Sequence, residues 1–498
     1  MNSRKIFILA LVLALLLSSC GQAAVTDGKD TTTDSTSAET TAPEPEYEYA
    51  DIDLGGETFT ILNTSQTYNF YSYLDFDEAT GETLNDAIFN RNRKAEDLYN
   101  FNLEIVEHEL KEANTKFGQA VLAGDASYDA AFLRDYYLNT ELTEGYLMNL
   151  DTVPEFRLDK EWWDGEVTEE SRIGKSRKAL FAMTDVSLCD FEGTMVTFIN
   201  ENIMTDLGLE NPYELVRSGK WTFDKFCEFM HAGASLGGDE SFTLKQDGNA
   251  RYGAASYERG SAALISGAGI DSAYIDDSGR PQIGYTGEKF YTYFEKIKAA
   301  FSVAGDYIHA NTGTVNDYGH YENLFKSGRA LMTLAQLKAA NNYRDMADAY
   351  GILPIPSMMR YRRITTACVH SHTSWLYRSL TTDRTRPDRS WIPFRIPHTR
   401  TSCRASTRSP SPPSRCPATT PHPPSRHRAL HADSIEMLGI VRSSRRFDVG
   451  SVYNIFLPLA DEVVYRSLSS NKEIASTMAT KVKTVEANID KIMAAMDK

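Results

Sequence analysis

Apolar and polar residues alternate along the first part of the globular chain in the pattern of a parallel α/β sheet. Residues 57–62 and 101–106 alternate with the period of two that is typical of a strand, and residues 128–133 form a short apolar strand. Between them, residues 84–99 and 113–122 have the spacing of amphipathic helices. The order strand, helix, strand, helix, strand predicts a parallel sheet with right-handed crossovers.

Polar side chains follow two of these strands directly. Asn63 comes after the first strand, and Arg134, Asp135 and Tyr136 come after the third. In open α/β sheets, ligands lie beyond the carboxyl ends of the strands. These residues therefore predict one side of a binding site.

The N-terminus has the layout of an export signal. An apolar run at residues 7–17 is too short to cross a bilayer, and the tripeptide Leu-Ser-Ser precedes Cys20. This arrangement resembles a bacterial lipobox, in which the cysteine thiol is acylated; an ordinary signal peptide with an incidental cysteine is the alternative. We expect residues 1–20 to be a lipoprotein signal, residues 21–50 to be a disordered acidic tether, and the protein to be extracytoplasmic and anchored by lipid to the cell membrane.

Composition narrows the function. The net charge of -16 argues against nucleic acid as a partner. The cysteines after Cys20 lack CxxC spacing, so the sequence predicts neither a metal knuckle nor a disulfide framework. Aromatic residues make up 11% of the chain, and exposed Tyr and Trp faces suit the stacking of sugars, although packing inside the core accounts for any one of them equally well. The folded part is long enough for two sizeable lobes.

Several sequence blocks together, by their order and spacing along the chain, resemble extracellular solute-binding proteins of family 1. These are the lipid-anchored substrate-binding receptors of carbohydrate ABC importers. One of the blocks, residues 219–228, resembles the start of a family helix that Thr222 would cap. The likeness covers residues 54–356 and 433–498. The other blocks are residues 124–133, 145–151, 161–164, 195–202, 325–334 and 350–356.

The resemblance implies an α/β fold of the two-lobed, periplasmic-binding-protein-like type II, with hinge crossings and a ligand cleft between the lobes. Lobe 1 would comprise residues 51–192 plus about 333–377, and lobe 2 residues 193–332 plus about 433–498. It also implies a monomer that captures a small solute, most simply a mono- or oligosaccharide, and delivers it to the membrane subunits of an ABC permease. No cofactor and no catalysis are implied.

Hydroxyl ligands in such a cleft need matched donors and acceptors, with aromatic faces over the sugar rings. On lobe 1 we expect Asn63, Arg134, Asp135 and Tyr136 to supply them. Structural alternatives remain open: Arg134 and Asp135 form a local ion pair, Trp162 packs between the lobes, and Asp185 forms a turn. The remaining candidates are Trp162 and Trp163 at the mouth, Asp185 before the first crossing, and Gln336 after the return strand.

Other patterns point to different functions. Asp185, Asp190 and Glu192 suggest a carboxylate pair for glycoside hydrolysis, which makes a surface-attached glycan-active hydrolase the alternative function, beside a non-transporting adhesin or sensor. The acidic loop at residues 239–249 lacks the spacing of a calcium loop, and Cys368 with the two nearby histidines lacks a fourth metal ligand. The sequence therefore predicts no metal site.

One region departs from the composition of the rest. Residues 389–432 contain no Asp or Glu and are crowded with Arg, Ser, Pro and His. This is either a basic disordered insert or a reading-frame error. We favour the frame error at residues 357–367 and 378–432, because one frame offset, with synonymous codons chosen freely, recodes residues 390–411 into an amphipathic helix and residues 357–366 into a family-like sequence.

Overall fold

A computed structural model describes the protein over residues 52–65, 72–153, 156–310, 320–358, 366–368, 374–377, 432–468 and 473–496. The predictions for the signal, Cys20 and the tether, and most of the anomalous region, lie outside these residues. All described residues belong to one compact unit, Tyr47–Lys498. No helix in the described ranges has both the length and the apolar character needed to cross a bilayer.

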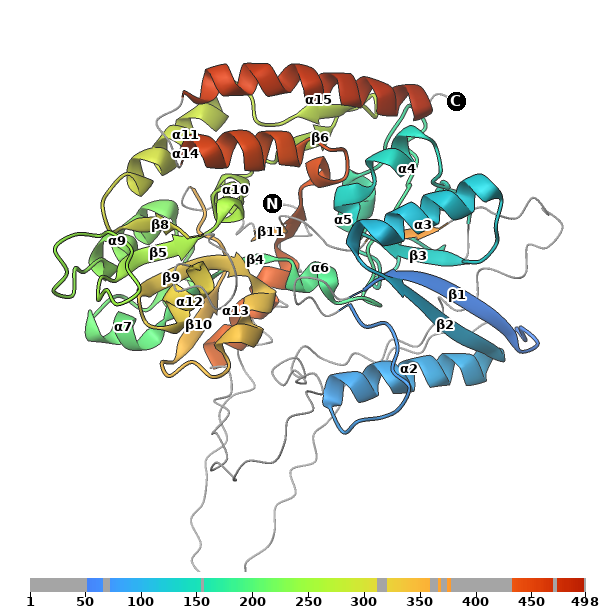
Figure 1. Ribbon diagram of the computed structural model, residues 1–498, viewed down its shortest axis with the longest axis horizontal. Coiled ribbons are helices and arrows are strands. Elements are labelled where there is room, and N and C mark those ends of the chain that lie inside the picture. Colours follow the sequence, from blue (N-terminus) through green and yellow to red (C-terminus); the bar gives the residue numbers. More distant parts are fainter. Residues whose placement is uncertain are drawn as a thin grey trace, which may run out of the picture. The chain divides into compact units, whose positions relative to one another are not determined.

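The first sheet has the strand order β12-β3-β1-β2, where β12 spans Ser374–Tyr377, and Figure 1 labels its other three strands. Its core strands β1 (Glu57–Thr64), β2 (Phe101–His108) and β3 (Ala130–Leu133) are parallel, so the predicted parallel sheet is confirmed. Helices α2 (Thr83–Tyr99) and α3 (Leu110–Ala123) connect them and cover opposite faces, because their apolar stripes pack into different clusters.

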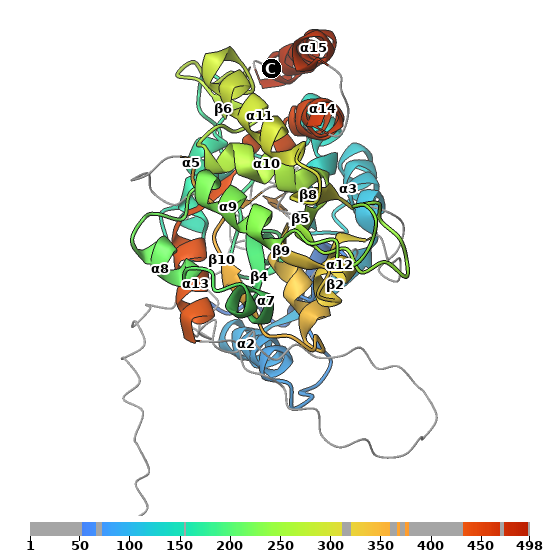
Figure 2. The same ribbon diagram turned by 90° about the vertical axis from the view of Figure 1, so that its left-hand side faces the viewer.

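The second sheet has the order β10-β4-β9-β5-β8. Its central strands β4 (Met195–Asn200) and β9 (Ala330–Gln336) are antiparallel and buried along their whole length. Figure 2 shows this sheet with α9 (Phe223–Gly233) on one side and α12 (Tyr321–Lys326) on the other. Thr222 caps α9 as predicted, accepting a hydrogen bond from the amide of Lys225 at 3.3 Å.

The remaining elements complete both halves. The strands are β5 (Tyr252–Ser256), β6 (Ala273–Ile275), β7 (Pro281–Ile283), β8 (Tyr307–His309), β10 (Tyr350–Leu353), β11 (Thr366–Cys368), β12 (Ser374–Tyr377) and β13 (Arg445–Phe447). The α-helices are α4 (Asn139–Thr143), α5 (Gly165–Glu170), α6 (Cys189–Glu192), α7 (Glu201–Asp206), α8 (Pro212–Arg217), α10 (Glu258–Gly267), α11 (Gly287–Phe301), α13 (Ala432–Ser443), α14 (Arg466–Leu468) and α15 (Ile474–Met496). The 3₁₀ helices are η1 (Asp135–Tyr137), η2 (Leu150–Thr152), η4 (Leu337–Tyr343) and η6 (Val449–Ser451), and η7 (Leu457–Tyr465) is a π-helix.

The expected boundary between the lobes needs a correction. The sequence division placed residues from about 333 to 377 with the first lobe, but β9 and β10 lie in the second sheet, on either side of β4. In the later part of that range, β12 does join the first sheet, antiparallel to β3. A fully buried apolar run reads the same in either sheet, so the sequence alone did not reveal the partner of β9.

The chain after the anomalous region packs against residues of both sheets. The largest hydrophobic cluster includes Leu62 and Leu133 of the first sheet, Leu334 of the second, and Val463 of the π-helix η7. At the start of the anomalous region, Met358 is also buried in this cluster. The two sheets therefore share one continuous core.

Candidate functional site

The carboxyl ends of β1 and β3 lie at the same edge of the first sheet, because these strands are parallel and Asn63 pairs in register with Phe132. Asn63 is buried, and its side-chain amide donates to the carbonyl of Ser72 at 2.9 Å and to Oε1 of Glu107 at 3.4 Å. These bonds link the end of β1 to Ser72 and to Glu107 of β2. The amide nitrogen of Asn63 thus has a local structural use.

Residues 134–136 form a fixed corner beyond β3. The Arg134 guanidinium lies 5.5 Å from the ring centre of Tyr136. Asp135 is fully buried and accepts hydrogen bonds from the amide of Tyr136 at 2.7 Å and from the hydroxyl of Ser451 at 3.0 Å. Burial raises the pKa of Asp135 to about 6, and the charges of Arg134 and Arg259 oppose that rise.

Residues from the second half of the chain surround this corner. Arg259, at the start of α10, pairs with Asp461 of the π-helix η7 at 3.6 Å. Burial lowers the pKa of Lys338 to about 8, and the charges of Arg134 and Arg259 add to this effect. Gln336, the last residue of β9, is also buried and lies two residues before Lys338.

These groups act on one another electrostatically, and we call them the polar cluster. Its members come from the ends of strands in both sheets, from α10 and from η7. The polar cluster consists of Arg134, Asp135, Tyr136, Arg259, Lys338 and Asp461.

The two candidate tryptophans lie in the hydrophobic core of the first sheet. Trp162 and Trp163 are buried, and the indole N–H of Trp163 donates to the carbonyl of Phe156 at 2.7 Å. The rings of Phe156 and Trp163 meet edge to face, with their centres 5.6 Å apart. Packing in the core of the first sheet describes these positions better than a stacking platform for sugars, and it differs from the packing between lobes that the sequence left open for Trp162.

Asp185 and Asp190 both have arginine partners. Asp185 is exposed and pairs with Arg442 at 3.2 Å. Asp190 is buried and pairs with Arg445 at 2.9 Å, and the same guanidinium reaches Asp164 at 2.5 Å. Each of these two carboxylates therefore has an arginine of its own as a partner.

The acidic loop after α9 is closed by protein groups. Asp239 accepts hydrogen bonds from the amides of Asn249 at 2.8 Å and Ala250 at 2.9 Å. Arg329 donates to the carbonyl of Lys245 at 2.9 Å and to that of Ala250 at 3.4 Å, so its guanidinium uses oxygens that a cation would need. Across the described residues, no group of three or more His, Cys, Asp or Glu side chains is placed to hold a metal ion. The two histidines near Cys368 lie outside those residues.

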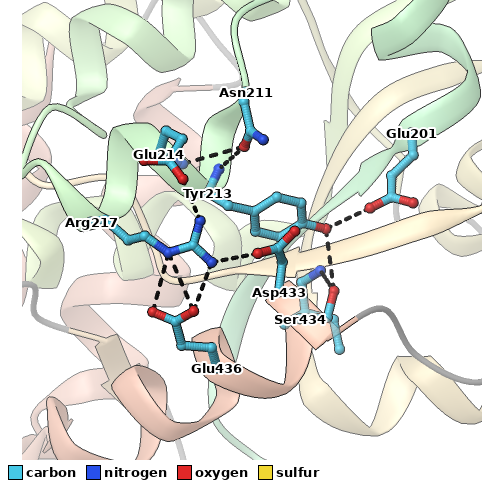
Figure 3. Close-up of polar contacts among 9 residues, drawn as sticks. Glu201, Asn211, Tyr213, Glu214, Arg217, Asp433, Ser434 and Glu436 are labelled. Atoms are coloured by element: carbon cyan, nitrogen blue, oxygen red, sulfur yellow. Dashed lines mark hydrogen bonds and ion pairs between the residues drawn. The ribbon is translucent and has the colours of Figure 1, made fainter. Parts of the chain in front are cut away.

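A second polar network docks α13 against α7 and α8 (Figure 3). The hydroxyl of Tyr213 donates to Oε1 of Glu201 at 2.6 Å and lies 3.2 Å from the hydroxyl of Ser434. Arg217 contacts three carboxylates, those of Glu214, Asp433 and Glu436. These contacts join α7, α8 and α13, and we infer that the network stabilises the packing of these helices.

A cavity of about 300 Å³ lies among residues of α4 and the end of α15, including Thr143, Lys178 and Met496. The Lys178 amine already donates to the carbonyl of Met496 at 3.2 Å. None of the polar-cluster residues lines this cavity.

Sequence reasoning found Arg134, Asp135 and Tyr136 but missed Arg259, Lys338 and Asp461. Arg259 and Lys338 follow β5 and β9 within three residues, so the rule that polar residues gather beyond strand ends would have found both. Asp461 carries no such signal, because a π-helix has no simple periodicity in the sequence.

Comparison with known proteins confirms the fold class. No protein-family model and no curated protein matches the chain. An ABC substrate-binding protein from Listeria monocytogenes, solved in complex with cycloalternan, is 12% identical, with a TM-score of 0.50 over 88% of this chain and 99% of that one. A cyclo/maltodextrin-binding protein complexed with maltotetraose is 12% identical, with a TM-score of 0.52 over 87% and 97%.

A maltose-binding protein from Listeria monocytogenes, in complex with maltose, is 14% identical, with a TM-score of 0.51 over 87% and 98% of the two chains. At these identities the likeness shows the fold. The predicted α/β fold of the periplasmic-binding-protein type II is therefore confirmed.

Proposed function

We propose that this chain, which has the fold of solute-binding proteins, is the substrate-binding receptor of an ABC importer and captures a mono- or oligosaccharide. The observation that carries the proposal is the polar cluster, where Arg134, Asp135 and Tyr136 from one sheet meet Arg259 and Lys338 from the other half. Solved structures of this fold include complexes with cycloalternan, maltotetraose and maltose.

The polar cluster suits the binding of hydroxyl groups. Arg and Lys donate hydrogen bonds, carboxylates accept them, and the Tyr136 ring offers an apolar face. A ligand that contacts both halves stabilises the arrangement in which they are close together, by its difference in affinity for the two arrangements. The permease would then read this ligand-bound state.

The buried position of Asp135 in the polar cluster is consistent with a site that binds a sugar without cleaving it. A hydrolase needs a carboxylic acid that reaches the glycosidic oxygen. Asp135 has a raised pKa, but it is fully buried and accepts hydrogen bonds from Tyr136 and Ser451. Asp135 is therefore not such an acid, and the alternative of a glycan-active hydrolase depends on Asp185, Asp190 and Glu192 instead.

We also propose that Cys20 carries the lipid anchor and that residues 21–50 tether the folded body to the cell membrane. The test is to express the full chain and a Cys20→Ser variant in a bacterial host and to separate membrane and soluble fractions. Retention of the wild type and release of the variant support the anchor. Equal release of both contradicts the anchor and leaves the receptor proposal intact.

The frame error remains our proposal for residues 357–367 and 378–432. Its two borders are well packed: the amide of Ser357 donates to the carbonyl of Trp221 at 3.1 Å, and Ser434 is buried against Tyr213. Resequencing the gene across the codons for residues 350–440 tests it. Compensating insertions and deletions support a frame error, whereas an unchanged sequence shows that the basic stretch is encoded.

The receptor itself is tested by thermal shift and calorimetry with a panel of neutral mono- and oligosaccharides, with each sugar recovered afterwards and analysed. We expect at least one sugar to stabilise the protein and to be recovered intact. Cleavage of the sugar supports the hydrolase. Retention on polysaccharide without binding of any small sugar supports the adhesin or sensor.

A further inference from the structure

Arg259 is a largely buried cation whose hydrogen bonds are unused in the described part of the chain. Its side chain is 14% exposed, and its nearest carboxylate, Asp461, is 3.6 Å away, which is beyond hydrogen-bond distance. Across the described ranges, no acceptor is bonded to the Arg259 guanidinium. Because a guanidinium carries five N–H donors and the nearest carboxylate lies beyond hydrogen-bond distance, Arg259 can donate to an added acceptor.

Asp461 is held at this place by an unusual backbone. It lies in the π-helix η7, whose second residue is Pro458, and its side chain is 13% exposed. Short π-helical segments frequently mark functional sites. Burial raises the pKa of Tyr136; the charge of Asp461 adds to this rise and that of Arg259 opposes it, so both members of the pair act on the same residue.

The charges around this pair are nearly balanced. Three cations act within the site: Arg134, Arg259 and Lys338. Four carboxylates oppose them: Asp135, Glu192, Glu322 and Asp461. No excess of positive charge remains for an anionic ligand to neutralise, and a carboxylate bound to Arg259 would approach Asp461.

We propose that Arg259 and Asp461 form a donor and acceptor pair that binds two adjacent hydroxyl groups of an uncharged sugar and discriminates against acidic sugars. Arg259 donates to one hydroxyl oxygen, and Asp461 accepts from the neighbouring hydroxyl. At a separation of 3.6 Å, the Arg259 guanidinium makes no hydrogen bond to the Asp461 carboxylate. This inference rests on the receptor function proposed above and specifies its ligand.

The test is calorimetry on the full chain with neutral probes (maltotetraose, cellotetraose and mannotetraose) and an acidic probe, tetragalacturonate. We expect a neutral probe to bind at least a hundredfold more tightly than tetragalacturonate. Arg259→Met should weaken the neutral probe at least tenfold. Asp461→Asn keeps the shape of the side chain but removes its charge. This variant should also reduce the difference in affinity between the neutral probes and the acidic probe.

The matched control is the exposed pair Arg280 and Asp490, which are 2.7 Å apart. Arg280→Met and Asp490→Asn should leave binding unchanged, and circular dichroism confirms the fold of every variant. Tighter binding of tetragalacturonate, or equal effects of Arg259→Met and Arg280→Met, overturns the inference while the receptor stands. Failure of the wild type to bind any probe overturns the receptor proposal itself.

Discussion

Replacing Arg445 with Met should destabilise the protein strongly, because one guanidinium neutralises two carboxylates. Arg445 bonds Asp164 at 2.5 Å and Asp190 at 2.9 Å, and the three side chains are between 10% and 17% exposed. Removing one partner of a buried ion pair costs about 3–5 kcal/mol, since the other charge stays buried. A neighbouring cavity of about 10 Å³ has room for one water, which offsets part of this cost.

We therefore expect Arg445→Met to lower the free energy of unfolding by about 3 kcal/mol at pH 7, measured by urea denaturation. The loss should shrink near pH 4. Burial raises the pKa of Asp190 and Arg445 opposes that rise, so in the variant the carboxyl takes up a proton more readily, and the protonated form is cheaper to bury.

Controls separate this mechanism from a general loss of packing. Arg280→Met removes an exposed ion pair and should change stability by less than about 0.5 kcal/mol. Adding Asp190→Asn to Arg445→Met should recover part of the loss. A loss no larger than that of Arg280→Met, or a loss independent of pH, would refute the reasoning.

Three further changes test single features. Tyr213→Phe removes one hydrogen-bond partner of the buried Ser434 and should lower the free energy of unfolding in urea by about 1–2 kcal/mol. No change would show that the network in Figure 3 does not contribute to stability. Burial raises the pKa of Glu141 to about 7, so wild-type stability should fall as pH rises from about 4.5 through 7. Glu141→Gln should make that decline smaller, by up to about 3 kcal/mol, in thermal melts at pH 5 and 8; pH profiles parallel to those of the wild type would contradict this. Thr222→Ala removes the cap of α9 and should lower the free energy of unfolding in urea by about 1 kcal/mol, whereas a loss below about 0.2 kcal/mol would show that the cap is dispensable.

The first sheet was predictable because its elements are local. The alternation in residues 57–62 and the stripe in residues 84–99 depend only on neighbours in the chain, and both elements formed within two residues of the predicted bounds. The corner at Arg134, Asp135 and Tyr136 followed from the direction of the parallel strands. In these cases the local sequence pattern was sufficient to predict the element and its position.

The parts that escaped prediction depend on long-range pairing. Buried β9 fits either sheet by its pattern, so its place beside β4 appeared only in the structure. Asp461 meets Arg259 although about two hundred residues separate them in the sequence, and the π-helix that carries it has no readable period. Trp162 and Trp163 suit a sugar platform and a core equally well by type, and only their burial decides between these roles.

The most direct test of the central proposal is calorimetric titration of the full chain with neutral oligosaccharides, with the sugar analysed by chromatography afterwards. The account predicts saturable binding of one sugar per protein and recovery of that sugar intact. It also predicts that Arg259→Met weakens this binding. Cleavage of the sugar, or the absence of binding by every neutral probe, would contradict the account.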